Sequence, residues 1–362
     1  MASRIDLNLS HSYLANPQQD SDYALLPLNI TFRSGGAYAL LGPSGCGKTT
    51  MLNIMSGLVR PSQGRVLFDG VDVTDQSPQL RNIAQVFQFP VIYDTMTVAE
   101  NLAFPLRNRQ IPESDIRKRV GQIAEMLELN GQLNQRAAGL TADAKQKISL
   151  GRGLVRSDVS AILFDEPLTV IDPHLKWQLR RKLKQVHQEL KLTLIYVTHD
   201  QVEALTFAQE VVVMTRGKAV QIGSAEDLFE KPAHTFVGHF IGSPGMNFLH
   251  GHISEQTLDL GQSRLHLSLD QSNRLQGFKQ IKLGIRPEYV EVHQQPTDNS
   301  LPAQVDRIQD LGTSVLMTMQ CAGQSVKARL APNFERFEVG SNVHISLLGR
   351  HTCFYHDEEL VV

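Results

Sequence analysis

Short apolar runs recur through the first two thirds of the chain and are separated by longer polar stretches. The clearest runs are 37–41 (AYALL), 161–164 (AILF) and 192–197 (LTLIYV). Apolar runs of this length are typical of parallel strands that are buried on both faces of a sheet. The stretch 107–130 is charged with helical spacing, so it predicts a helix with a solvated face. The pattern indicates an α/β arrangement around a parallel sheet.

Alternation of apolar and polar residues marks two other regions. Residues 64–74 (GRVLFDGVDVT) alternate around an Asp-Gly pair, which predicts a hairpin turn. Beyond a Gly- and Pro-containing stretch at 242–245, short alternating segments follow one another through the last third of the chain. Short strands at regular spacing predict an all-β barrel or sandwich. We therefore assign 236–250 to a linker and 251–362 to a β-barrel domain.

Composition excludes several classes of protein. The 362 residues suggest two domains, and a formal net charge of −2 argues against a chain held on nucleic acid or on an anionic membrane by bulk charge. Three widely spaced cysteines show neither a disulfide framework nor metal-ligand spacing, so we expect a reducing cytosol. No apolar run reaches the roughly 18 residues that a membrane-spanning helix needs. We expect no nucleic-acid partner, and membrane contact only through other subunits.

A glycine-rich loop follows the first apolar run and fits G-x-x-x-x-G-K-[ST]. Its glycines let consecutive backbone N–H groups point at phosphates, and the helix that follows aims its positive end at the same anion. Lys48 supplies a charge for the β and γ phosphates, and the Thr49 hydroxyl can hold Mg²⁺. The candidate ATP-binding residues of the loop are Gly42, Pro43, Ser44, Gly45, Cys46, Gly47, Lys48, Thr49 and Thr50.

Acidic and imidazole side chains follow two other predicted strands. Asp165 and Glu166 come directly after the run 161–164, at the strand end where open α/β sheets bind ligands. We expect Asp165 to hold Mg²⁺ and Glu166 to act as general base on the attacking water. His199 follows the run 192–197 and can contact the γ-phosphate or orient that water.

The order of these motifs resembles the ATP-binding subunits of ABC transporters over residues 1–235. The resemblance rests on GPSGCGKTT, VFQFPVIYDTMTVAENLAFPL, ILFDEPL, TVIDPHL and VTHD. It implies that Gln88 occupies the family's glutamine loop, where it contacts Mg²⁺ and water and senses a membrane subunit. It also implies that Asp172 lies at the seam of an ATPase dimer.

The same resemblance leads us to expect an aromatic residue that stacks on adenine before the glycine-rich loop. Tyr13 follows the strand-like stretch IDLNLS and is the better match. Tyr23 is the alternative, because ANPQQDSDY looks like an insertion between the two tyrosines.

The C-terminal third resembles the regulatory domain of maltose-type sugar importers. The resemblance lies in LGIRPEYV at 283–290 and in the ending LLGRHTCFYHDEELV. It implies folds of the oligonucleotide-binding type, although a barrel alone says little about what it binds.

The family's L-S-G-G-Q signature is replaced here by LTADA at 140–144. In the family, this segment of one subunit clasps the γ-phosphate held by the other. Thr141 keeps a hydroxyl, but Ala142 and Asp143 replace both glycines, so side chains stand where backbone must approach the nucleotide. Asp143 also adds a negative charge toward a polyanion. As a helix start the segment is favourable, since Thr can cap and Asp suits the dipole.

We therefore expect a poor phosphate clasp beside an intact catalytic set, an asymmetry that favours a heterodimer with a second ATP-binding subunit. The chain most resembles one of the paired ATP-binding subunits of glycerol importers. The resemblance implies ATP hydrolysis at the cytoplasmic face of the bacterial inner membrane, two transmembrane permease subunits and, indirectly, a periplasmic solute-binding protein. Two alternatives are a soluble ABC-type ATPase acting on nucleic acid or ribosomes, and a regulatory subunit that binds ATP without hydrolysing it.

Overall fold

The computed structural model describes residues 2–169, 171–334 and 337–361. The chain divides into two compact units, the first ending at Ser224 and the second beginning at Ala225. Within the described residues, no helix combines the length and apolar character needed to cross a bilayer. Each unit is described by itself below.

A six-stranded sheet forms the centre of the first unit. Its strands are parallel except for β10, which pairs antiparallel with β9. Every residue of β3 and β8 is buried, as expected for strands covered on both faces. The carboxyl ends of β3, β7 and β8 therefore meet at one edge. In spatial order the strands are β10 (Lys218–Gly223), β9 (Glu210–Thr215), β3 (Ala37–Leu41), β8 (Leu194–Thr198), β7 (Ala161–Asp165) and β6 (Ile83–Val86).

The first unit also contains a four-stranded antiparallel sheet. Asp69 and Gly70 form the turn between β4 and β5 with φ of 48° and 81°. Positive φ at both positions belongs to the turn that matches the twist of a hairpin, so the predicted hairpin is confirmed. In spatial order the strands are β2 (Leu25–Phe32), β1 (Ile5–His11), β4 (Gln63–Phe68) and β5 (Val71–Asp72).

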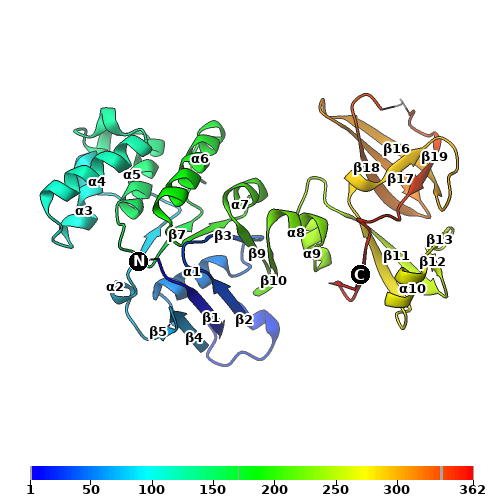
Figure 1. Ribbon diagram of the computed structural model, residues 1–362, viewed down its shortest axis with the longest axis horizontal. Coiled ribbons are helices and arrows are strands. Elements are labelled where there is room, and N and C mark those ends of the chain that lie inside the picture. The colour runs from blue at the N-terminus through cyan, green and yellow to red at the C-terminus, as the bar shows by residue number, and fades with distance from the viewer. Residues whose placement is uncertain (1, 170, 335–336, 362) are drawn as a thin grey trace. The chain divides into compact units, whose positions relative to one another are not determined.

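Helices of the first unit contribute to different apolar clusters. α3, α4 and α5 gather together beyond the sheet (Figure 1), with their apolar residues in one buried cluster. α1 lies with the two sheets, where Met51, Leu52, Ile54 and Met55 join a second cluster. The helices are α1 (Lys48–Ser56), α2 (Pro78–Arg81), α3 (Val98–Arg107), α4 (Glu113–Met126), α5 (Ala142–Leu154), α6 (Pro173–Leu190) and α7 (Gln201–Phe207).

The second unit consists mainly of two antiparallel sheets around one apolar cluster. The first contains, in spatial order, β13 (Arg264–His266), β12 (Thr257–Asp259), β11 (Asn247–Ser254), β14 (Gln280–Ile285), β20 (Cys353–His356) and β21 (Glu359–Leu360). The second contains β15 (Glu291–His293), β19 (Asn342–Ser346), β16 (Leu301–Asp310), β17 (Val315–Cys321) and β18 (Gln324–Leu330). Three short helices complete it: α8 (Ala225–Glu230), α9 (Thr235–Phe240) and α10 (Leu269–Arg274). The predicted combination of an α/β domain with an all-β domain is confirmed.

The division between the units comes earlier in the chain than the predicted boundary at 235, and the predicted linker 236–250 contains most of α9 and the start of β11. Arg286 explains the difference. Its guanidinium is 1% exposed and donates to the carbonyls of Phe229 on α8 and Ile241 after α9, each at 2.5 Å. This buried cation, held by carbonyls at the helix ends, joins both helices to the sheets of the second unit, which we call the β-unit.

Candidate nucleotide-binding and hydrolysis site

The loop between β3 and α1 is shaped by its glycines. Gly45 and Gly47 adopt φ of 79° and 100°, which other residues rarely adopt. A methyl group on Gly42 would collide with the carbonyl of Met214, and one on Gly47 with the carbonyl of Ala24. The loop can therefore follow this tight path only with glycine at both collision points.

Helix α1 begins without a side-chain cap from the residue that precedes it. The residue before its first turn is Gly47, which offers no side-chain hydrogen bond to the first N–H groups. Lys48 is 5% exposed, and its Nζ donates to the carbonyls of Gly42 and Pro43 at 2.8 and 2.9 Å. Backbone donors at a helix start without such a cap, next to a buried cation, suit an anionic phosphate. The loop geometry fits the β and γ phosphates of a nucleotide.

Thr49 and Asp165 meet across the loop and the end of β7. The Thr49 hydroxyl donates to Asp165 Oδ1 at 3.3 Å. Burial raises the pKa of Asp165; the Thr49 hydrogen bond opposes that rise, and the charge of Glu166 adds to it. A partly buried carboxylate next to a hydroxyl and a second carboxylate offers the hard oxygen ligands that Mg²⁺ prefers. The donor set fits a divalent cation.

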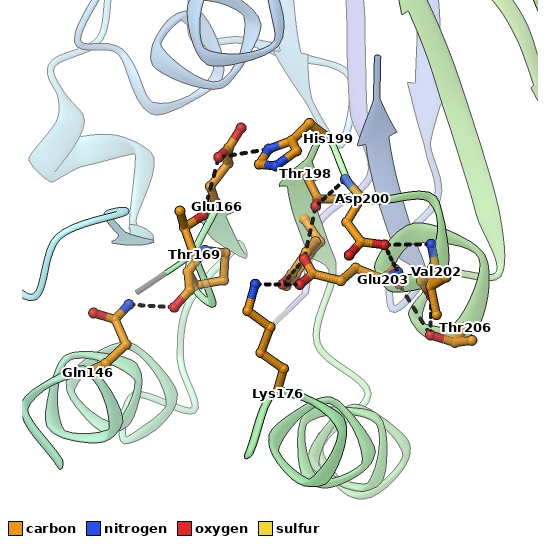
Figure 2. A network of polar contacts seen from close by, with 12 residues as sticks. Gln146, Glu166, Thr169, Lys176, Thr198, His199, Asp200, Val202, Glu203 and Thr206 are labelled. Atoms are coloured by element: carbon orange, nitrogen blue, oxygen red, sulfur yellow. Dashed lines mark hydrogen bonds and ion pairs between the residues drawn. The ribbon is translucent and has the colours of Figure 1, made fainter. Parts of the chain in front are cut away.

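Glu166 and His199 come from neighbouring strands and point toward each other (Figure 2). His199 Nδ1 lies 3.1 Å from Glu166 Oε2, which also accepts from the Thr169 hydroxyl at 3.2 Å. Glu166 has φ of 45°, and its N–H donates to the carbonyl of Val197 on β8. Such a backbone conformation is uncommon outside glycine and is concentrated at functional sites. It turns the side chain toward the imidazole rather than along the strand.

Gln88 lies on the segment that follows β6, and Asp172 lies on the segment that precedes α6. Gln88 is half-buried and follows the end of β6, whose neighbour in the sheet is β7. Asp172 is exposed immediately before α6. The structure thus places Gln88 at the same carboxyl edge as Asp165, and Asp172 at an exposed position before α6.

Tyr13 lies beside the start of α1. Its side chain is 65% exposed, and its hydroxyl is 3.2 Å from the Thr50 hydroxyl. The ring of His11 packs edge-on against it, with centroids 4.6 Å apart. Tyr23 is partly buried, and its carbonyl lies near Gly217. An exposed ring next to the loop suits stacking on a base, which favours Tyr13 over Tyr23.

The segment 140–144 begins helix α5 and is capped from within. The Thr141 hydroxyl accepts from the N–H of Ala144 at 3.3 Å. Asp143 Oδ2 lies 3.2 Å from Lys147 Nζ one turn later, with only 25% and 16% of the two side chains exposed. The negative charge that we expected Asp143 to add toward a phosphate is offset by Lys147. What remains against a phosphate is the lost access to backbone N–H groups at 142 and 143.

Two polar contacts at this site involve residues that the sequence analysis did not single out. Gln146 on α5 is fully buried and donates to the carbonyl of Pro167 at 2.6 Å, directly after Glu166. Glu203 on α7 is 4% exposed and accepts from the Thr198 hydroxyl at 2.9 Å. Both are polar residues at positions that face inward on their helices, which was the signal available in the sequence.

Comparison with protein families identifies three regions. A model described as ABC transporter matches residues 25–169, one described as MalK OB fold domain matches 242–290, and one described as TOBE domain matches 283–354. The first region holds the glycine-rich loop and the Asp165–Glu166 pair, and the other two lie within the β-unit.

Individual relatives agree with these regions. The protein is 40% identical over 307 residues to an sn-glycerol-3-phosphate import ATP-binding protein UgpC of Pectobacterium atrosepticum, covering 84% of this chain and 85% of the relative. The UgpC of Escherichia coli strain K12 is 39% identical over 325 residues, covering 89% and 90%. Among solved structures, cbiO1 from Clostridium perfringens, part of the ABC transporter complex cbiONQ, matches with a TM-score of 0.57 and 25% identity, covering 63% of this chain and 90% of that one.

Proposed function

The chain belongs to the family of ATP-binding subunits of ABC importers, which hydrolyse ATP to drive transport, and we propose that its cargo is glycerol, glycerol 3-phosphate or a related polyol. The names of the two UgpC relatives support this class of solute. These relatives give no support to the alternative of an ATPase that acts on nucleic acid or ribosomes. In the proposed arrangement, the solute contacts other subunits and never this chain.

The observation that carries the catalytic proposal is the contact between Glu166 and His199 at the sheet edge beside the glycine-rich loop. Lys48 and the first N–H groups of α1 hold the phosphates of ATP, with the Tyr13 ring on adenine. Glu166 accepts the proton of the attacking water, and His199 orients that water or the γ-phosphate.

Mg²⁺ is the cofactor that this donor set would hold, through Thr49, Asp165 and Gln88. When bound, it neutralises negative charge on the phosphates. Asp165 provides the charge for this site, because its carboxylate is partly buried, accepts from the Thr49 hydroxyl and is only partly offset by the charge of Lys48.

We propose that the chain works at the cytoplasmic face of the membrane, bound to two permease subunits that receive solute from a periplasmic binding protein. Closure of two ATP-binding subunits around ATP would move the permeases, and release of the products would reopen them. Asp172 would lie at the seam of that dimer.

The start of α5 supports a dimer with a different ATP-binding subunit. Ala142 and Asp143 stand where the family has glycines, and the Thr141 hydroxyl caps its own helix by accepting from the N–H of Ala144. A partner with an intact signature would serve the nucleotide on this chain. The second composite site, built with 140–144 of this chain, would turn over slowly or serve only to hold the dimer.

Uptake tests the hydrolytic role. Glu166→Gln keeps the size of the side chain but removes the base, so uptake of labelled glycerol and glycerol 3-phosphate should fall by roughly 100-fold or more. Glu128→Gln is the matched control, since that carboxylate pairs with Lys182 at the surface. Normal uptake by Glu166→Gln would instead identify a subunit that binds ATP without needing to hydrolyse it.

ATPase activity of the purified full-length chain tests the pairing. We expect the native chain to be nearly inactive and a variant with Ser-Gly-Gly-Gln at 141–144 to hydrolyse ATP at least about tenfold faster, since removing one set of aligned donors costs about that much or more. If the native chain is as active as the variant, 140–144 is a competent clasp and a homodimer is the better description.

A further inference from the structure

A buried carboxylate that the proposed mechanism does not use lies behind His199. Glu203 Oε2 accepts from the Tyr196 hydroxyl at 3.0 Å and from the Thr198 hydroxyl at 2.9 Å, and Lys176 Nζ lies 3.7 Å from Oε1. Removing an ionised carboxylate from water is costly unless several donors replace the water. The two hydroxyls and the lysine therefore stabilise the Glu203 carboxylate in its buried position.

Three hydrogen bonds connect this carboxylate to the peptide that follows His199. The Thr198 hydroxyl donates to Glu203 and accepts from the N–H of Asp200 at 3.0 Å. Asp200 Oδ1 in turn accepts from the N–H of Glu203 at 3.1 Å. The bonds form a closed ring of Thr198, Asp200 and Glu203 beside His199, which Figure 2 shows between the end of β8 and the start of α7.

The direction of these bonds is fixed by chemistry. The Thr198 hydroxyl donates its one hydrogen to Glu203 Oε2, which leaves a lone pair of the hydroxyl oxygen for the Asp200 N–H. Burial and the charge of Glu203 raise the pKa of Tyr196, so that side chain also remains a donor. Without Glu203, the Thr198 hydroxyl would lose the acceptor that orients it.

His199 needs such support because its own side chain is loosely held. The side chain is 55% exposed, and it pairs with the Glu166 carboxylate. Its position therefore depends on the backbone between Thr198 and Asp200.

We propose that Glu203 is a positioning residue for hydrolysis, which acts through the Thr198 hydroxyl to hold the His199–Asp200 peptide and so keeps the imidazole against Glu166. This inference rests on the proposed function, in which His199 acts at the γ-phosphate.

The test compares two substitutions that each remove one hydroxyl from the same carboxylate oxygen. Thr198→Val breaks the link to the His199–Asp200 peptide, whereas Tyr196→Phe removes a bond to Glu203 but leaves that link intact. ATP hydrolysis is measured on the transporter complex purified through a tag on this full-length chain. We expect Thr198→Val to lower kcat roughly 10- to 100-fold, as small misplacements of catalytic groups do, with the KM for ATP little changed. Tyr196→Phe should stay within about twofold of the native rate, because it leaves His199 in place.

Equal losses in the two variants, or a native rate in Thr198→Val, would overturn the proposal. Glu203→Gln, which keeps an acceptor, should recover much of the rate lost in Glu203→Leu, and no recovery would also count against it. Thermal unfolding of each variant identifies any that fail to fold, and the Thr198→Val and Tyr196→Phe pair carries the test if Glu203→Leu is among them.

His199→Ala distinguishes a failure of this proposal from a failure of the proposed role of His199 in ATP hydrolysis. If His199→Ala hydrolyses ATP normally, the proposed role of His199 fails, whatever Thr198→Val does. If His199→Ala is slow, the double variant with Thr198→Val should be no slower, because the Thr198 link then has nothing left to position. A further loss in the double variant would show that Thr198 acts by another route and would overturn the inference.

Discussion

Helices α1 and α5 both start within the first unit, and both starts belong to segments that the ABC family uses to hold phosphate. At α1 the residue before the first turn is Gly47, which has no side chain to cap the helix, and Lys48 is buried in the first turn. At α5 the Thr141 hydroxyl caps the N–H of Ala144, and Asp143 provides an anion in the first turn.

The difference shows that capping and anion binding are competing uses of the same backbone groups. Both helix starts carry the same positive end of a helix dipole. An internal hydroxyl and carboxylate satisfy it at α5, so the helix is complete without a ligand. At α1 the preceding glycine provides no such cap, so we expect the sequence that stabilises α5 to make it the poorer phosphate clasp of the two.

The largest expected effect comes from removing the cation at each helix start. Lys48→Ala should lower ATP hydrolysis by the complex by roughly 100-fold or more, since it removes a charge aimed at the transferred phosphate. Lys147→Ala on α5 should leave ATP binding by the isolated chain unchanged, because Lys147 neutralises Asp143. ATP hydrolysis by the complex, together with ATP binding by the isolated chain measured by calorimetry, checks both variants. Equal weakening by the two would erase the contrast between the helices.

Adenine stacking extends the contrast to a side chain next to α1. Tyr13→Ala should weaken ATP binding by about 10-fold, because stacking on a base contributes about 1–3 kcal/mol. Tyr23→Ala should bind ATP normally, and Tyr13→Phe should retain most of the affinity because the ring remains. The reverse result, with Tyr23→Ala weakened and Tyr13→Ala normal, would move the adenine site to the other tyrosine.

Strand and loop positions around α1 could be predicted from the sequence because their signals are local. An apolar run, glycines at fixed spacing and a Lys-Thr pair determine β3, the loop and the first turn together. The strand that carries Asp165 was also local, since its apolar run ends at that residue. The predicted roles of these side chains in catalysis remain predictions.

Features that depend on distant partners could not be predicted. The apolar run at 192–197 gave no sign that Glu203, on the next helix, would bind back to Thr198. The stretch before β11 looked like a linker because its Gly and Pro residues are visible in the sequence, whereas the Arg286 contacts that hold α8 and α9 join residues far apart in the chain.

A smaller effect sharpens the account of α5 as a capped helix. Thr141→Ala should destabilise its first turn by about 1 kcal/mol, the usual contribution of such a cap. Amide hydrogen exchange at Ala144 should then be roughly fivefold faster, because that N–H loses its acceptor. Thr141→Ser should exchange at nearly the native rate. Unchanged exchange in Thr141→Ala would mean that the cap contributes nothing to the helix.

The smallest effect contrasts the carboxylates at the two sites, Asp165 beside α1 and Asp143 in α5. Burial raises the pKa of Asp165, so the folded chain binds a proton there more readily than the unfolded chain does. Its contribution therefore favours the folded state below the ordinary pKa of Asp and is lost as pH rises through the raised value. Asp165→Asn should melt slightly higher than the native chain at pH 7, with the gain shrinking toward pH 4.

Asp143→Asn is the matched control and should change the melting temperature in the opposite direction. It removes an ion pair with Lys147 and a favourable charge at a helix start, together worth about 0.5–1 kcal/mol. Mg²⁺ at pH 7 should raise the melting temperature of the native chain and of Asp143→Asn, because both keep the Asp165 carboxylate that would bind the cation. It should not raise the melting temperature of Asp165→Asn, which lacks that carboxylate. If both aspartate variants melt lower at pH 7, the Asp165 carboxylate is compensated within the fold, and a cation site at that position loses its physical basis.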